Sequence, residues 1–271
     1  MRTPSPGTVA GLVTTMGKNP RTPDWAALLR GWDAQQESFS PLRERRFSVM
    51  LDVLGASVGT RFTSLDLGSG PGSLSVRLLR RFPAARVIAV DYDPVTLAIG
   101  RGALGSQQGR LTWVDAKLAA PGWTDRLPRR RIDAAVSTTA LHWLSPAGLR
   151  ALYLDLAELL PRGGVFLNGD YLAWGARDRG LRHVAAKVYR QRLRGVATGK
   201  QWSAWTEWWE RAERIPALRP YFEERKRRAA HHPKRETVSI AVHEEALRSA
   251  GFREVGVVWQ DIENRVLFAR R

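Results

Sequence analysis

A glycine-rich stretch at residues 65–72 is the clearest candidate for chemistry in this sequence. It reads Leu-Asp-Leu-Gly-Ser-Gly-Pro-Gly, follows a short apolar run and precedes a helical pattern. Glycines in such a turn let a ligand come close to the backbone, and the free N–H groups at a helix start can bind it. Dinucleotides and cofactors without phosphate both use loops of this kind.

The loop fits a pyrophosphate poorly. A dinucleotide site has the pattern G-x-G-x-x-G, but Ser73 stands at the third glycine position and Pro71 lacks an N–H donor. Asp66 adds a negative charge where a phosphate would need a positive one. A cationic ligand suits the loop better, because a carboxylate and backbone carbonyls can satisfy an ammonium group. Asp66 could alternatively be a plain loop or capping residue.

Two further acids follow apolar runs. Asp91 ends the run 86–91 and Asp115 ends the run 110–115. Asp91 stands 21 residues after Gly70, close to the ~20-residue offset of a ribose-binding acid in nucleotide-binding folds. Each acid could instead cap the helix that follows, although Asp93, directly before Pro94, is the better cap at the first of these positions.

The glycine-rich stretch 65–72, the run that ends at Asp91 and the run that ends at Asp115 follow one another along the chain. In this order they resemble the motifs of the class I S-adenosylmethionine-dependent methyltransferases. The likeness covers roughly residues 30–170 and 240–271. Within it, the glycine-rich stretch 65–72 is similar to the family pattern acidic-x-Gly-x-Gly-x-Gly. The resemblance implies S-adenosylmethionine as the cofactor. The cofactor-binding residues that it implies are Asp66, Gly68, Ser69, Gly70, Asp91, Tyr92, Asp115, Ala116, Ser137 and Thr138.

The resemblance also implies a role for each part of this set. Asp91 would bind both ribose hydroxyls, and Tyr92 would lie beside the adenine. Asp115 would accept a hydrogen bond from the adenine amino group, with the N–H of Ala116 nearby. Carbonyl groups near Ser137 would face the ammonium group. On the helical segment that precedes the sheet, Arg46 or Gln36 could meet the cofactor's carboxylate.

His142 is the candidate catalytic residue. It lies in residues 140–143, Ala-Leu-His-Trp, a run that most resembles the small-molecule group that includes the trans-aconitate methyltransferases. An imidazole there could act as a general base for the methyl acceptor, or it could line the pocket or bond the backbone. The expected reaction is in-line attack by an O, N or C nucleophile on the sulfonium methyl. That methyl is already activated, so no metal is expected.

Short apolar runs alternate with amphipathic helical patterns over the middle of the chain, which predicts βαβ units and a parallel sheet. The runs are residues 62–68, 86–91, 110–115, 132–137 and 164–170. Two final strands, at 252–260 and 263–271, are expected to form an antiparallel hairpin. The fold class is α/β, a doubly wound, mostly parallel seven-stranded sheet with a helical lid. The family resemblance implies the strand order 3-2-1-4-5-7-6.

Three regions are expected: a flexible tail at 1–23, a methyltransferase domain at 24–170 and 236–271, and a helical insert at 171–235. The insert holds 17 Lys and Arg against six Asp and Glu. Tryptophans at 202, 205, 208 and 209 follow helical spacing, so they form either the buried face of a lid helix or an aromatic enclosure for the acceptor. The cation run 225–235 could be a solvated face, a guide for an acidic substrate or an RNA contact.

The composition limits the remaining choices. The 271 residues include no cysteine, which excludes disulfides, thiolate metal sites and cysteine nucleophiles. The net charge of +17 permits an anionic partner, but 37 of the 43 cations are Arg, a bias that a GC-rich genome also produces. With no membrane-length apolar run and no signal-peptide pattern, we expect a cytoplasmic protein.

The expected partner is a small-molecule methyl acceptor, acidic ones included. Nucleic acid is the less favoured alternative, in which a tRNA or rRNA methyltransferase would hold RNA with the basic insert. A noncatalytic cofactor-binding protein is the third. The sequence leaves the acceptor, the oligomeric state and the use of a general base open.

Overall fold

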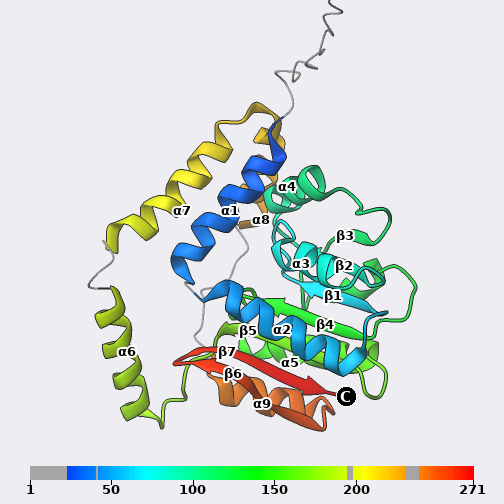
Figure 1. Cartoon of the computed structure of the whole chain (residues 1–271), viewed down its shortest axis with the longest axis vertical. Helices are drawn as coiled ribbons and strands as arrows, with labels where there is room; N and C mark the ends of the chain where they lie inside the picture. The colour runs from blue at the N-terminus through cyan, green and yellow to red at the C-terminus, as the bar shows by residue number, and fades with distance from the viewer. Residues whose placement is uncertain (1–22, 41, 194–197, 230–237) are drawn as a thin grey trace, which may run out of the picture.

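The computed structural model describes residues 23–40, 42–193, 198–229 and 238–271. Its centre is one seven-stranded sheet in the order β3-β2-β1-β4-β5-β7-β6 (Figure 1). The strands are β1 (Thr63–Leu67), β2 (Arg86–Asp91), β3 (Leu111–Asp115), β4 (Ala134–Thr138), β5 (Val165–Tyr171), β6 (Glu254–Asp261) and β7 (Asn264–Arg270). The first five are parallel, and β7 runs antiparallel to both β5 and β6. The predicted fold class, strand order and final hairpin are confirmed.

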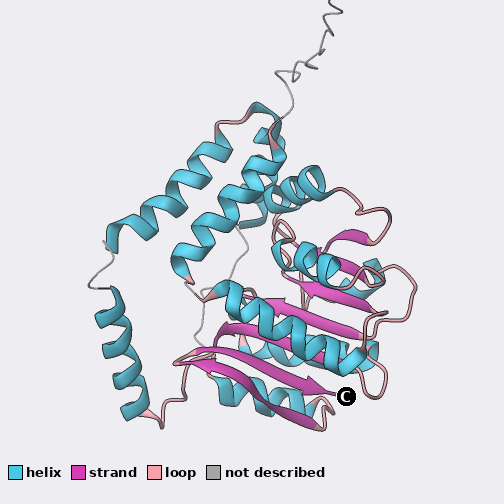
Figure 2. Ribbon diagram, in the orientation of Figure 1, coloured by secondary structure: helices cyan, strands magenta, loops and turns pink. Residues whose placement is uncertain are grey.

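Helices cover both faces of the sheet (Figure 2). One face packs against α2 (Arg43–Val58) and α3 (Ser73–Arg81), and the other against α5 (Pro146–Leu159) and α9 (Ile240–Ser249). Successive strand residues point to opposite faces, so both faces of a central strand need apolar side chains. This requirement explains the short, nearly continuous apolar runs by which the strands are recognised in the sequence.

A third apolar cluster lies above one end of the sheet. It joins α1 (Trp25–Phe39) and α4 (Pro94–Leu104) to α7 (Thr198–Glu213), η3 (Pro216–Leu218) and α8 (Arg219–Ala229). These last three elements and α6 (Arg179–Leu193) are the helices that the structure describes within residues 171–235.

Tryptophans form the centre of this third cluster. The ring of Trp32, from α1, lies 5.9 Å from the Trp205 ring, 5.1 Å from that of Trp208 and 6.0 Å from that of Trp209. Trp208 is buried. The tryptophan stripe, as far as its side chains are described, is therefore a packing face; the side chain of Trp202 lies outside the described part.

Helix ends follow the expected capping chemistry. Asp24 accepts from the N–H of Ala27 at the start of α1, and Asp93 accepts from those of Val95 and Thr96 at the start of α4. Two 3₁₀ turns, η1 (Trp123–Arg126) and η2 (Leu141–Trp143), follow β3 and β4. Among the described helices, none is both long and apolar enough to cross a membrane. The predicted tail at 1–23 falls almost wholly outside the described residues.

Candidate functional site

The strand register brings the predicted site residues to one edge of the sheet. Asp91 and Asp115 are direct neighbours at the ends of β2 and β3, and Leu67 pairs with Ser137 at the ends of β1 and β4. Ligands bind at the carboxyl ends of the strands in open α/β sheets. The structure therefore places the predicted residues where this fold class binds ligands.

The glycine loop bends back onto β2. The N–H groups of Gly68 and Ser69 both donate to the carbonyl of Val90, at 2.8 and 3.0 Å. Gly68 has a φ of +68°, and a Cβ at this position would lie 2.3 Å from the Cβ of Ala140. Only glycine permits this conformation together with this approach. The loop after β1 and the segment after β4 are consequently packed against each other.

Asp91 holds this loop through its carboxylate. One oxygen accepts the N–H of Gly70 at 2.6 Å, and the other accepts those of Tyr92 and Asp93, each at 2.8 Å. Burial raises the pKa of Asp91 to about 6. A carboxylate has roughly four acceptor positions, so one is left without a donor among the described residues and could accept from a ligand.

Asp66 lies inside β1, not in the loop, and its side chain is fully buried. Its Oδ2 accepts from the Ser75 hydroxyl at 2.6 Å, whereas its Oδ1 has no hydrogen-bond partner among the described residues. Burial raises the pKa of Asp66 to about 7, and the charge of Asp91 adds to the effect. A buried acceptor without a donor is costly in a native structure, and a cationic ligand would relieve that cost.

We expect Asp66→Asn to gain stability relative to the wild type as pH rises. The folded chain keeps the proton up to a pKa of about 7, whereas the ordinary value is 3.8. Between these values the folded state binds more protons than the unfolded state, so its stability falls as pH rises, and asparagine removes this dependence. From about pH 5 to about pH 8 the relative gain is on the order of 2 kcal/mol. Urea unfolding of both proteins measures it; parallel pH profiles would contradict the assignment.

Tyr92, which follows β2, and Asp115, which ends β3, contact an arginine that the sequence did not predict to lie beside them. Arg228 donates to both oxygens of Asp115, at 2.7 and 2.9 Å, and its guanidinium lies 4.5 Å from the ring centre of Tyr92. The N–H of Ala116 donates to the carbonyl of Asp91 at 2.9 Å, so that donor already has a partner. The Ser137 hydroxyl donates to the carbonyl of Leu67 at 2.8 Å.

Arg46 is fully buried at the ends of β4 and β7. It donates to the hydroxyl of Thr138 at 3.0 Å and to the side-chain oxygen of Asn264 at 2.9 Å. Burial lowers its pKa. Its two terminal nitrogens thus have partners within the chain, and a contact between Arg46 or Gln36 and the cofactor's carboxylate stays a prediction.

His142 pairs with an acid at the end of β5. Its Nδ1 lies 2.8 and 3.0 Å from the two oxygens of Asp170, which is fully buried. Burial alone would raise the pKa of Asp170, but His142 and Arg46 hold it below its ordinary value. Asp170 is not among the site residues predicted from the sequence, although it ends a predicted strand just as Asp91 and Asp115 do.

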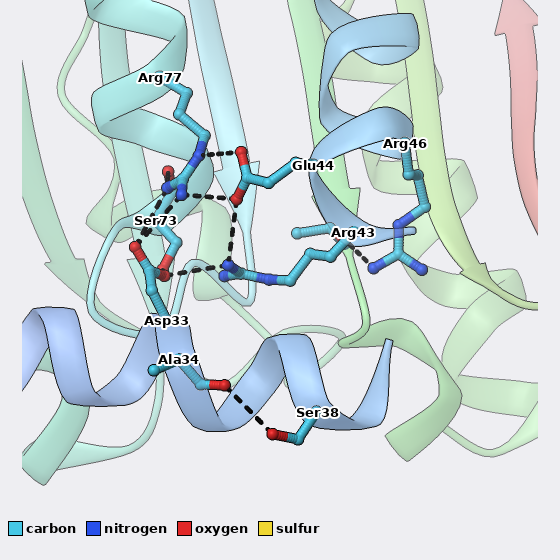
Figure 3. A network of polar contacts seen from close by, with 9 residues as sticks. Asp33, Ala34, Ser38, Arg43, Glu44, Arg46, Ser73 and Arg77 are labelled. Carbon is cyan, nitrogen blue, oxygen red and sulfur yellow. Dashed lines mark hydrogen bonds and ion pairs between the residues drawn. The ribbon is translucent and has the colours of Figure 1, made fainter. Parts of the chain in front are cut away.

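A polar network fixes α1 and α2 beside the glycine loop (Figure 3). Asp33 of α1 accepts from Ser73 at 2.6 Å, from Arg43 at 3.0 Å and from Arg77 at 3.3 Å. Glu44 accepts from Arg77 at 2.7 Å. Because Ser73 and Arg77 belong to α3, the helix that follows the loop, these contacts join the two N-terminal helices to the site.

The four cations at 225–228 each pair with a carboxylate of the same chain. Their partners, in chain order, are Asp93 for Arg225, Glu213 and Glu223 for Lys226, Glu224 for Arg227, and Asp115 with Glu224 for Arg228. This part of the run is therefore neutralised internally. The rest of it, from residue 230 onward, lies outside the described residues.

Comparison with known proteins agrees with the fold described above. Residues 65–164 match the family model described as a methyltransferase domain. Proteins named trans-aconitate 2-methyltransferase are 33% identical over 142 residues in Methylobacterium radiotolerans and 30% identical over 135 residues in Azoarcus sp.. The matched stretches cover 52% and 49% of this chain but only 46% and 48% of those proteins. The chain thus matches about half the length of these curated relatives.

Solved structures share the fold. The apo form of the S-adenosylmethionine-dependent methyltransferase SibL has a TM-score of 0.54 at 19% identity and covers 90% of this chain and 57% of its own. DesVI from Streptomyces venezuelae has a TM-score of 0.55 at 12% identity and covers 89% and 97%. Residues 65–164 thus match a methyltransferase domain, the relatives that share this part of the chain are named methyltransferases, and the solved structures share the fold.

Proposed function

We propose that this chain transfers the methyl group of S-adenosylmethionine to an O, N or C nucleophile of a small acidic molecule. One observation carries the proposal. The close approach of Gly68 to Ala140 sets η2, and with it the His142–Asp170 pair, directly against the glycine loop. The loop suits a cofactor and the histidine suits an acceptor, so the two halves of a transfer site are adjacent.

The residues present fit this cofactor. The orphaned Oδ1 of Asp66 is a buried acceptor that matches an ammonium group, and a cation there would favour the ionised form of the carboxyl. The remaining acceptor position of Asp91 matches a ribose hydroxyl, and the loop around Gly68 leaves no room for a side chain. When bound, the cofactor supplies a methyl group on a sulfonium that needs no further activation. The protein's own work is then to position the acceptor and exclude water.

His142 would act on the acceptor. Asp170 is anionic and bonds Nδ1, which favours the tautomer with its proton on that nitrogen. The other ring nitrogen, Nε2, is thereby left as an acceptor. It can take the proton of an attacking hydroxyl or amine as the bond to the methyl group forms. The role of Asp170 is to orient the ring and to stabilise its protonated form.

An acidic acceptor is supported by the names of the relatives. The names of the relatives specify trans-aconitate, a carboxylic acid, as their acceptor. No observation favours RNA, since the four described cations at 225–228 are paired within the chain. The division into a domain at 24–170 and 236–271 with an insert at 171–235 stays part of the proposal.

The test combines binding and turnover. Calorimetric titration of nuclease-treated protein with S-adenosylmethionine and S-adenosylhomocysteine should show micromolar binding. Formation of S-adenosylhomocysteine should then be measured with a panel of polycarboxylic acids, hydroxy acids, phenols and amines, with bulk tRNA as the competing acceptor. Turnover is expected with an acid of the panel. Absence of cofactor binding would refute the proposal, and turnover with tRNA alone would replace the acceptor class.

A further inference from the structure

Arg228 lies where the adenine of the cofactor is expected. Asp115 and Tyr92 are the two residues assigned to the adenine amino group and the adenine ring, and Arg228 contacts both. It donates to both carboxylate oxygens of Asp115, at 2.7 and 2.9 Å, and to the carbonyl of Tyr92 at 2.6 Å. Its guanidinium lies 4.5 Å from the centre of the Tyr92 ring.

The guanidinium and an adenine share the features that these two residues recognise. Both groups are planar, both present N–H donors to a carboxylate, and both stack on an aromatic ring. The Arg228 side chain is 18% exposed, so it is held in place and not extended into solvent. Its Nε also donates to Glu224, one turn earlier in α8, at 2.8 Å.

The rest of α8 holds the arginine against this end of the sheet. Arg225, on the same face of the helix, donates to Asp93 at 2.6 Å and lies 4.0 Å from the ring centre of Trp209. Phe222 is buried in the cluster that joins α1, α4 and α7. These contacts do not involve Asp115. The anchoring of α8 is therefore separate from the contact between Arg228 and the expected adenine position.

We propose that Arg228 is an internal competitor for the purine subsite, so that the cofactor binds only by displacing its guanidinium from Asp115. This inference rests on the proposed function, because the adenine roles of Asp115 and Tyr92 come from the family resemblance and require that the chain binds S-adenosylmethionine. Exchange of a partly exposed ion pair for an amino group costs a modest amount of free energy. The arginine should therefore weaken cofactor binding without abolishing it.

The test is titration calorimetry with S-adenosylhomocysteine and, separately, with adenosine, which carries the purine but no methionine portion. Arg228→Ala is expected to increase the affinity for both ligands by a similar factor of about 3- to 10-fold. The reason is that the ion pair that the wild type must break to bind them is worth roughly 1 kcal/mol. Arg228→Lys should fall between the wild type and alanine, since an ammonium group cannot chelate the carboxylate with two donors. Thermal unfolding of each variant checks that α8 remains folded.

Arg227→Ala is the matched control. It removes the same charge from the neighbouring position, but the Arg227 side chain is 76% exposed and, among the described residues, its ion-pair partner is Glu224. The affinities of Arg227→Ala for S-adenosylhomocysteine and adenosine should equal those of the wild type. Raising the salt concentration should tighten binding to the wild type and leave Arg228→Ala unaffected, because salt screens the competing ion pair.

The outcomes separate the two proposals. If the wild type binds S-adenosylhomocysteine and Arg228→Ala binds it equally or more weakly, the competitor role is refuted and the proposed function stands. An affinity gain for Arg227→Ala equal to that of Arg228→Ala would mean that only net charge matters, which also refutes it. If neither the wild type nor Arg228→Ala binds either ligand, both proposals fail.

Discussion

Replacing His142 by glutamine is expected to lower kcat by about 10²- to 10⁴-fold, the usual contribution of a general base. Glutamine keeps a polar side chain near Asp170 but cannot accept a proton at neutral pH. The fall should appear in kcat and in kcat/KM alike, because proton removal belongs to the transition state. Initial rates of S-adenosylhomocysteine formation with the best acceptor of the panel measure this effect.

Two further variants make the His142 prediction specific. Asp170→Asn should lose much of the same activity, because an amide can donate to Nδ1 and so favours the opposite tautomer. His183→Gln changes an exposed histidine of α6 in the same way and should leave the rate unchanged. Cofactor affinity should be similar in all three proteins, because the described close approach to the glycine loop is made by Ala140, which none of the variants changes.

A different result for His142→Gln would identify another role. If the acceptor atom is a carboxylate that is already ionised, no proton has to be removed. The variant would then show a raised KM with an unchanged kcat, which is the pattern of lost ground-state binding. This outcome would contradict the general-base role and make His142 an anchor for the acidic group. The split between kcat and KM therefore decides between a base and an anchor.

The parts of the site that the sequence predicts are those positioned by the sheet alone. Asp91 and Asp115 each end a strand, and parallel register brings such strand ends together. Their neighbourhood follows from local patterns, namely an apolar run and the acid after it. The same reasoning would have identified Asp170 at the end of β5, because its signal is of the same kind.

The remaining contacts depend on how helices dock, which local patterns do not encode. Arg228 is 113 residues from Asp115 along the chain, and Asn264 is 218 residues from Arg46. Nothing in a run of four cations shows which one meets a carboxylate of the sheet edge and which faces solvent. The tryptophan stripe has the same property: its spacing shows that one helical face is apolar, but not that Trp32 of α1 covers it.

Asp91→Asn is expected to weaken the binding of S-adenosylhomocysteine by at least about 100-fold. Asparagine keeps one acceptor oxygen and presents an NH₂ group where the carboxylate now accepts a backbone N–H. Loss of charged hydrogen bonds worth roughly 1.5–3 kcal/mol each accounts for this factor. Calorimetry measures it, with Asp52→Asn on the exposed face of α2 as the unaffected control. Binding within about threefold of the wild type would remove Asp91 from the cofactor site.

A loss of ligand affinity in Asp91→Asn can have two sources, because the carboxylate accepts a hydrogen bond from Gly70 in the loop and also offers an acceptor to the ribose. A ligand cycle separates them. Adenosine and an adenosine that lacks the 2′- and 3′-hydroxyls are each titrated into the wild type and into Asp91→Asn. The effect of removing the hydroxyls on the binding free energy is then compared between the two proteins. If Asp91 contacts the ribose, removal of the hydroxyls weakens binding to the wild type but not to the variant. If the carboxylate acts only through the loop, the two ligands differ by the same factor in both proteins, and the role of Asp91 is confined to shaping the loop around Gly70.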